Sequence, residues 1–248
     1  MKHAHSILGM IYLSFMAPLQ SSDGEMEKFN TYINESISDA NIAGMAVAIV
    51  SGDSIIFTQG YGYSDIQTKE PFTPNTVINI ASISKTFVGV ALMNLVENGL
   101  ISLDEDVNTF LPFKVQNPYL PESIITPRHL MSHSSGIQDN QKVYLPSYHY
   151  GGDSPIPLGE FLADYLSPDG THYSKKNFTK SNPGGNFVYS NIGAGLAGYI
   201  VERVSGKPLN VFTREIIFKP LGMNNTCWFL SEMDREKHSR LYESKKNN

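Results

Sequence analysis

The first part of the chain alternates between helical and strand-like hydrophobic patterns. Between residues 25 and 39, apolar positions recur every three or four residues, which predicts an amphipathic helix. A nearly continuous apolar run over 45–50 is followed by a short polar turn and a second apolar run over 54–61. Two such runs around a turn predict a hairpin of buried strands. Gly60 and Gly62 are predicted to mark a strand end or a bulge.

The rest of the chain shows mainly helical spacing. A helix is predicted over 86–98, and Gly99 is placed to end it in a left-handed cap. Further helices are predicted over 128–132, 158–166, 191–204 and 208–218. The expected organisation is α+β: an N-terminal helix and hairpin, then a mostly helical region. Because a two-stranded hairpin is not a stable sheet alone, it needs helices or further strands to pack on.

Composition favours an ordinary globular protein. Hydrophobic residues make up 41% of the 248 positions and charged residues 17%, with a net charge of −5. Without a basic cluster, nucleic acid is not an expected partner. Cys227 is the only cysteine, which excludes an intramolecular disulfide, and it is interpreted as a small core residue. His129 and His133 are spaced as a metal pair, but no third ligand accompanies them, so neither a metal nor another cofactor is expected.

The first 20 residues have the pattern of an export signal. Lys2 and His3 precede an apolar run over 7–16, and small and polar residues follow. The run is shorter than the ~20 apolar residues that span a bilayer. We expect a signal peptide over 1–20 and an exported domain over 21–248, periplasmic or secreted, without a stable membrane span. The alternative is a buried N-terminal segment of a cytoplasmic protein.

The candidate chemistry begins at Ser82-Ile83-Ser84-Lys85, the only S-x-x-K element in the chain. It lies where a loop leads into the helix predicted over 86–98. Residues three apart on a helix share a face, so the Lys85 ammonium is expected within reach of the Ser82 hydroxyl. Serine needs a neighbouring base, and burial and the positive helix end both disfavour a charged lysine. Alternatively, Ser82 only caps the helix and Lys85 is solvated.

A second element, Tyr189-Ser190-Asn191, follows a Pro-Gly-Gly-Asn turn and precedes a predicted helix. Tyr189 could complete a proton relay with Lys85. The Asn191 amide could hold the lysine and bind a substrate carbonyl. The alternative for Tyr189 is a half-buried aromatic residue. The same Y-x-N letters at 32–34 lie on the predicted N-terminal helix without a turn, so only the second copy is a candidate.

These two elements resemble the first two signatures of class C β-lactamases and their penicillin-binding relatives. Those relatives include D-alanyl-D-alanine carboxypeptidases, D-aminopeptidases and esterases. Further stretches resemble the family in the same order, at 60–63, 72–76, 129–137 and 218–223. The resemblance implies a β-lactamase/transpeptidase-like fold in which Ser82 is acylated, Lys85 and Tyr189 act as base and then acid, and Asn191 holds the substrate amide. It also implies that the Ser82 backbone N–H forms half of an oxyanion hole.

The family's third signature, Lys-Thr-Gly or a variant on a late strand, is not found before Asn248. We therefore expect a domain whose C-terminal sheet strands are missing, with a hairpin region over 21–66 and a helical region over 67–230. The resemblance implies a serine hydrolase that acts through an acyl-enzyme on an ester, a D-amino-acid peptide or a β-lactam, including peptides derived from peptidoglycan. The alternative is a non-catalytic remnant that binds cell-wall peptide.

Overall fold

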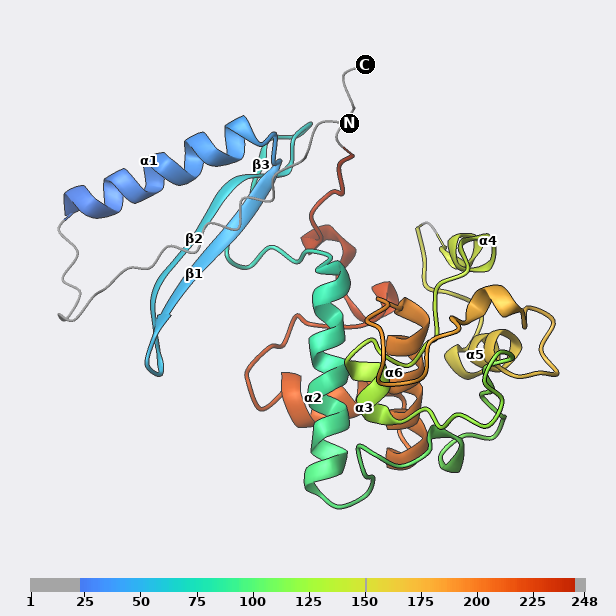
Figure 1. The fold of residues 1–248 in the computed structure, drawn as a ribbon. Coiled ribbons are helices and arrows are strands. Elements are labelled where there is room, and N and C mark those ends of the chain that lie inside the picture. The colour runs from blue at the N-terminus through green and yellow to red at the C-terminus, as the bar shows by residue number, and fades with distance from the viewer. Residues whose placement is uncertain (1–22, 150, 244–248) are drawn as a thin grey trace. The chain divides into compact units, whose positions relative to one another are not determined.

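The computed structural model describes residues 23–149 and 151–243, so the export signal predicted over 1–20 lies outside the described residues. The chain divides into two compact units (Figure 1). Unit 1 holds the described residues up to Thr76 and from Ser239 onward, and unit 2 runs from Val77 to His238. No helix in the described ranges is long and apolar enough to cross a membrane.

Unit 1 is a helix packed along a small antiparallel sheet. Its elements are α1 (Asp23–Asp39), β1 (Gly44–Ser51), β2 (Ser54–Asp65) and β3 (Glu70–Pro71), with sheet order β1-β2-β3. Figure 1 shows α1 lying along the hairpin, where the rings of Phe29 and Phe57 meet edge to face at 5.6 Å. The predicted helix and hairpin are confirmed. β3 was not predicted, because two residues carry no readable periodicity.

The prediction that Gly60 and Gly62 mark a strand end or bulge is wrong. β2 continues through both glycines to Asp65, and the hairpin bulge lies near the turn, between Ile49 and Val50. The glycines are instead needed for close backbone approach. A Cβ on Gly60 would lie 2.0 Å from the Phe72 carbonyl oxygen, and Gly62 has φ +68°.

Unit 2 is mainly helical. Its helices are α2 (Ser84–Glu97), α3 (Pro127–Met131), α4 (Gln141–Tyr144), α5 (Leu158–Leu166), α6 (Asn191–Ser205) and α7 (Leu209–Thr213), and α7 continues as a π-helical turn (Arg214–Phe218). The helices predicted from apolar spacing are confirmed to within a few residues, whereas the four-residue α4 was not predicted. Gly99 ends α2 as expected, with φ +69° and a bond from the Leu100 N–H to the Leu95 carbonyl at 3.0 Å.

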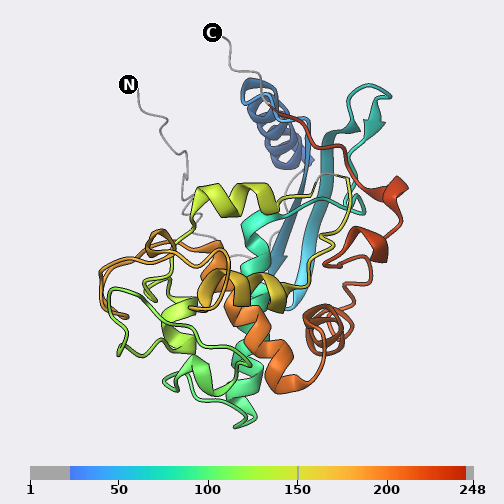
Figure 2. The ribbon, with the colours of Figure 1, turned by 90° about the vertical axis from the view of Figure 1, so that its right-hand side faces the viewer.

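The core of unit 2 forms where α2 packs against α6 (Figure 2). Leu92 and Leu95 from α2 are fully buried with Leu196 and Ile200 from α6. Each Leu or Ile side chain buried in this way stabilises the fold by about 1.5–3 kcal/mol. Because the candidate nucleophile directly precedes α2 and the candidate tyrosine directly precedes α6, this packing sets the spacing between them.

Candidate active site

Ser82 lies in a single 3₁₀ turn, Ala81–Ile83, which leads directly into α2. Ala81 has φ +46°, a left-handed conformation that costs a non-glycine residue about 1 kcal/mol. Its N–H donates to the Asn79 side-chain oxygen at 2.8 Å, which supports the turn. The Ser82 side chain is exposed and Lys85 is half-buried one turn further on.

The hydroxyl oxygen of Ser82 receives two hydrogen bonds from predicted site residues. Lys85 Nζ donates to Ser82 Oγ at 3.0 Å, and the Tyr189 hydroxyl donates to the same oxygen at 2.7 Å. Lys85 Nζ also lies 5.0 Å from the centroid of the Tyr189 ring. The structure therefore brings together the serine, the amine and the phenol that the sequence predicted as a catalytic set.

The environment of Tyr189 makes its phenol more acidic than usual. Partial burial raises the pKa of Tyr189, but hydrogen bonds with Lys85 and Ser82 and the charge of Lys85 outweigh this effect. The resulting pKa lies below the ordinary 10.0. A phenol with a lowered pKa gives up and takes back a proton more readily near neutral pH, as a proton relay requires.

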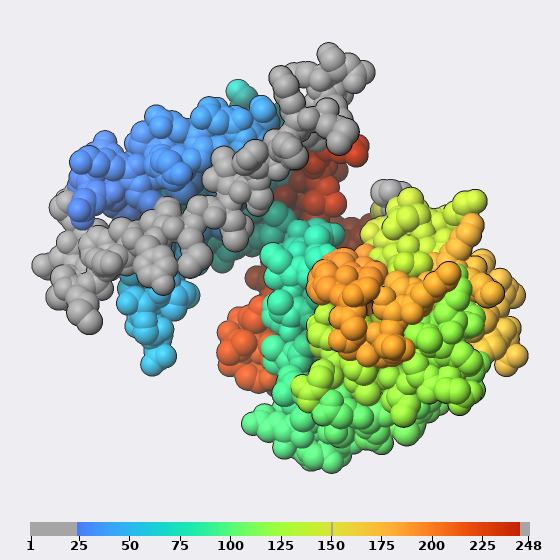
Figure 3. Space-filling view, in the orientation of Figure 1, coloured from blue at the N-terminus to red at the C-terminus, as the bar shows by residue number. Residues whose placement is uncertain are grey.

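Backbone hydrogen bonds to residues 133–136 hold the segment before Tyr189 in place. The Val188 N–H donates to the His133 carbonyl at 2.7 Å, and the Thr179 N–H donates to the Gly136 carbonyl at 2.7 Å. Gly136 ends the His-Ser-Ser-Gly turn over 133–136, and its φ of +77° favours glycine at this position. Figure 3 shows the orange surface of this part of the chain beside the green-blue surface of α2, in agreement with the Tyr189–Ser82 bond.

Asp139 is a residue of the candidate site that the sequence pattern did not predict. Its Oδ1 accepts from the Ser190 hydroxyl and the Ile192 N–H, both at 3.1 Å. Its Oδ2 accepts from the Asn191 N–H at 3.1 Å and from Asn191 Nδ2 at 2.7 Å. A carboxylate at the N-terminus of α6 also suits the helix dipole. The available signal was an acidic residue three positions after the glycine of the His-Ser-Ser-Gly turn.

Asn191 is therefore oriented by Asp139. Among the described residues, its amide makes no hydrogen bond to Lys85 or Ser82, so the structure does not bring it onto the lysine. An amide nitrogen carries two hydrogens, and one of them is used by Asp139.

His129 and His133, which are spaced as a metal pair in the sequence, have other partners in the structure. The His129 Nδ1 accepts from the Thr126 N–H at 3.2 Å, and the His133 Nδ1 accepts from the Ser190 N–H at 3.2 Å. Within 23–149 and 151–243, no three His, Cys, Asp or Glu side chains gather as a metal site.

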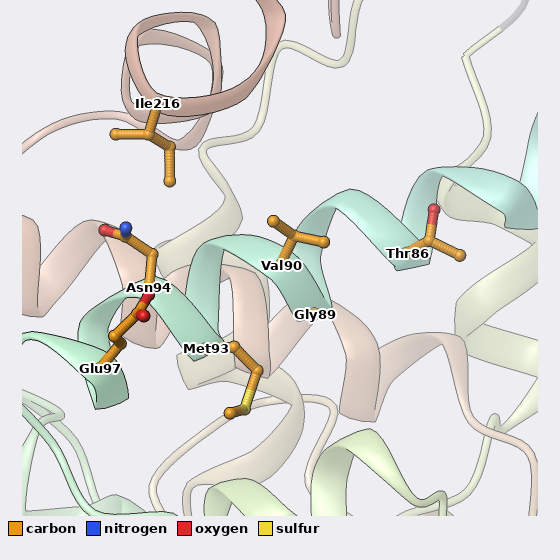
Figure 4. Close-up of a pocket in the computed structure, with 7 residues that line it drawn as sticks. All are labelled: Thr86, Gly89, Val90, Met93, Asn94, Glu97 and Ile216. Atoms are coloured by element: carbon orange, nitrogen blue, oxygen red, sulfur yellow. The ribbon is translucent and has the colours of Figure 1, made fainter. Parts of the chain in front are cut away.

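A hollow of about 420 Å³ lies along one face of α2 (Figure 4). Its lining residues are Thr86, Gly89, Val90, Met93, Asn94, Glu97 and Ile216. The hollow is separate from the candidate active site, because none of its lining residues is Ser82, Lys85 or Tyr189.

Comparisons with known proteins agree on one family. A family model described as Beta-lactamase matches residues 28–248. The protein flp of Staphylococcus aureus (strain MRSA252) is 27% identical, over 89% of this chain and 41% of its own length. Penicillin-binding protein 4* of Bacillus subtilis (strain 168) is 28% identical, over 77% of this chain and 39% of its own. The chain thus spans about two fifths of the length of these relatives.

Solved structures give the same fold. The octameric penicillin-binding protein homologue from Pyrococcus abyssi has a TM-score of 0.70 and 30% identity, over 84% of this chain and 45% of its own. The D-amino acid amidase from Ochrobactrum anthropi SV3 has a TM-score of 0.68 and 26% identity, over 87% of this chain and 57% of its own. The β-lactamase/D-alanine carboxypeptidase from Yersinia pestis has a TM-score of 0.67 over 88% of this chain and 60% of its own. At 21% identity, it supports the fold alone. The predicted α+β, β-lactamase/transpeptidase-like fold is confirmed.

Proposed function

Because this chain belongs to the beta-lactamase family, whose model matches residues 28–248, we propose that it is a serine hydrolase that works through an acyl-enzyme on Ser82. The observation that carries the proposal is the pair of hydrogen bonds on Ser82 Oγ, from Lys85 at 3.0 Å and Tyr189 at 2.7 Å. An amine and a phenol on one serine hydroxyl are the groups needed to remove its proton and to return it.

In the first step, Ser82 Oγ attacks the carbonyl carbon of the substrate while its proton passes to the phenolate oxygen of Tyr189. The Lys85 ammonium stabilises the phenolate. Partial burial raises the pKa of Tyr189, but Lys85 contributes to a net lowering of that pKa. The tetrahedral intermediate then collapses, the leaving group takes the proton from Tyr189, and the acyl group stays on Ser82 as an ester.

In the second step, a water molecule attacks the ester carbonyl and gives its proton to Tyr189. The acid is released and the proton returns to Ser82 Oγ, which restores the starting state. Negative charge on the carbonyl oxygen is stabilised in both steps by the Ser82 backbone N–H. Asn191 uses the amide hydrogen not bound to Asp139 to hold the substrate carbonyl.

The proposed substrate is a small ester, a D-amino-acid peptide or amide, or a β-lactam. All three present an acyl carbon to an attacking serine. The relatives support this range, since a D-amino acid amidase at 26% identity and penicillin-binding proteins at 28% and 30% are among them.

The N-terminal apolar run, which lies outside the described residues, supports the further proposal that the protein is exported. A cell-wall peptide is one substrate that an exported hydrolase would meet.

Covalent labelling tests the function directly. The chain is treated with a fluorescent penicillin and, separately, with a fluorophosphonate, and the adduct is located by mass spectrometry. We expect labelling on Ser82 that disappears in Ser82→Ala and persists in Ser84→Ala, the matched serine of the same motif. A folded wild-type protein that takes up neither probe would rule out the hydrolase and favour a non-catalytic binder of cell-wall peptide.

A further inference from the structure

His133 contacts four consecutive residues of the segment that carries Tyr189. Its carbonyl accepts from the Val188 N–H at 2.7 Å, and its Nδ1 accepts from the Ser190 N–H at 3.2 Å. Its ring lies 5.7 Å from the Phe187 ring and 4.5 Å from the Tyr189 ring. One residue thus binds the backbone on either side of Tyr189 and also contacts the ring of Tyr189 itself.

The backbone of His133 is itself unusual. Its φ of +53° lies in the left-handed region, which histidine adopts only when its surroundings hold it there. This conformation lets the carbonyl and the imidazole of one residue reach the same segment, 188–190. A residue that contacts Tyr189 and is held in an unfavourable backbone conformation is more consistent with a role in positioning Tyr189 than with simple core packing.

The bond from Ser190 depends on the protonation of the imidazole. An Nδ1 that accepts a hydrogen bond carries no proton, so the neutral ring has its proton on Nε2. Once protonated, Nδ1 becomes a donor and faces the N–H of Ser190. Ser190 is 1% exposed, so water has little access to that N–H if the bond is lost.

The charged and titratable groups around His133 come from three elements: Lys85 from α2, Tyr189 from the segment before α6, and Asp139 from the end of its own turn. Burial lowers the pKa of His133, Lys85 lowers it further, and Asp139 opposes them. The resulting pKa lies below the ordinary 6.5, so the neutral ring is present at neutral pH and is lost as the pH falls through that lowered pKa.

We propose that His133 is a positioning residue that holds Tyr189 against Ser82 while the imidazole is neutral and releases it when the imidazole is protonated. The catalytic consequence rests on the proposed function, in which Tyr189 exchanges protons with Ser82. The step itself is a simple proton uptake: His133 Nδ1 gains a proton, its bond to the Ser190 N–H breaks, and the Tyr189 segment loses that anchor.

The pH profile of hydrolysis separates this role from a general structural one. With p-nitrophenyl acetate as substrate, log(kcat/KM) of the wild type should fall on the acid side with a slope approaching two, one proton for the relay and one for His133. His133→Asn tolerates a left-handed φ and offers an oxygen where Nδ1 stood. Its kcat/KM at neutral pH should stay within about tenfold of the wild type. On the acid side, its slope of log(kcat/KM) against pH should fall from about two to about one.

His133→Phe keeps a ring beside Tyr189 but removes the acceptor. We expect kcat to fall about 100-fold at neutral pH, the size of effect caused by a small misplacement of a catalytic group, with KM changed little. His172→Asn, which alters a half-exposed histidine beside Asp164, is the control and should leave both the rate and the slope unchanged. An acid slope in His133→Asn identical to that of the wild type would overturn the proposal.

A spectroscopic measurement tests the positioning without relying on turnover. In protein labelled with ¹⁵N, the neutral His133 ring should show its proton on Nε2, and the Ser190 amide resonance should shift with the same pH midpoint as the ring. The same result is expected in Ser82→Ala. A proton on Nδ1, or a Ser190 amide unaffected by the titration of His133, would disprove the positioning. Intact coupling without any labelling of Ser82 would instead locate the failure in the proposed hydrolase function.

Discussion

At the scale of single residues, the acidity of Tyr189 depends on one amine. Burial raises the pKa of the phenol, and it is chiefly Lys85, through a hydrogen bond and its charge, that brings the value below 10.0. In Lys85→Met the opposing effect of burial remains, so the Tyr189 pKa should rise above that of the wild type. Tyrosinate absorbance, taken as the difference between each protein and its Tyr189→Phe counterpart, measures the change.

The sign of this shift fixes the pH at which the phenolate forms. With Lys85 present, phenolate is populated at lower pH, and without it the same population needs more alkaline conditions. Lys219→Met, an exposed lysine on the turn after α7, is the matched control and should leave the Tyr189 titration in place. A Tyr189 midpoint that is equal in the Lys85→Met protein and the wild type would show that the ammonium does not set the acidity of the phenol.

A second residue-scale prediction concerns Asp139, whose two oxygens accept four hydrogen bonds from residues 190–192. In Asp139→Asn, one oxygen becomes an NH₂ group that faces donors. We expect the free energy of unfolding to fall by about 2 kcal/mol, the usual size for bonds to a charged group. Urea unfolding measures it. Asp169→Asn, at an exposed position of a loop, should change stability by less than about 0.5 kcal/mol.

At the scale of elements, apolar periodicity in the sequence predicts the long helices but not the short elements. α1, α5 and α6 begin or end within two residues of their predicted limits, because each carries two or more turns of apolar spacing. α4 and β3 are too short for any pattern. Gly60 was misread, since a sequence does not reveal that the backbone of Phe72 approaches β2 at that residue.

The sequence likewise predicted part of the candidate site, namely the residues that local spacing or a neighbouring turn identifies. Ser82 and Lys85 are three residues apart on one chain segment, so local geometry was enough to pair them, and the turn before Tyr189 distinguished it from Tyr32 on α1. Asp139 accepts from the backbone N–H groups of Asn191 and Ile192, and His133 accepts from those of Val188 and Ser190. Backbone donors look alike in every sequence, so the residue letters did not show that Asp139 and His133 would accept hydrogen bonds from them.

The close approach at Gly60 gives a prediction for the hairpin. Gly60→Ala places a Cβ 2.0 Å from the Phe72 carbonyl oxygen, so the backbone must shift, at a cost of about 1–3 kcal/mol. Faster hydrogen exchange of the β1 and β2 amides would report the loss. Gly24→Ala in α1 is the control: its Cβ meets nothing within 4 Å, and alanine is the better helix former. Unchanged hairpin exchange in Gly60→Ala would contradict the close packing.

At the scale of the whole molecule, every described contact that builds the site lies inside one unit. Ser82, Lys85, His133, Asp139 and Tyr189 all belong to unit 2, although 107 positions separate the serine from the tyrosine. The single tryptophan, Trp228, is also in unit 2, where its Nε1 donates to Thr213 Oγ1 at 2.8 Å. Tryptophan fluorescence therefore follows the unfolding of the same unit that holds the nucleophile.

This arrangement predicts that labelling of Ser82 follows the stability of unit 2. Leu92→Ala removes a fully buried side chain between α2 and α6 and should destabilise unit 2 by about 2–5 kcal/mol. The urea midpoints of Trp228 fluorescence and of fluorophosphonate labelling should fall together. Gly60→Ala, in unit 1, should leave both midpoints in place while its hairpin amides exchange faster. If Gly60→Ala lowered the labelling midpoint as far as Leu92→Ala does, unit 2 would not by itself hold Ser82, Lys85 and Tyr189 together.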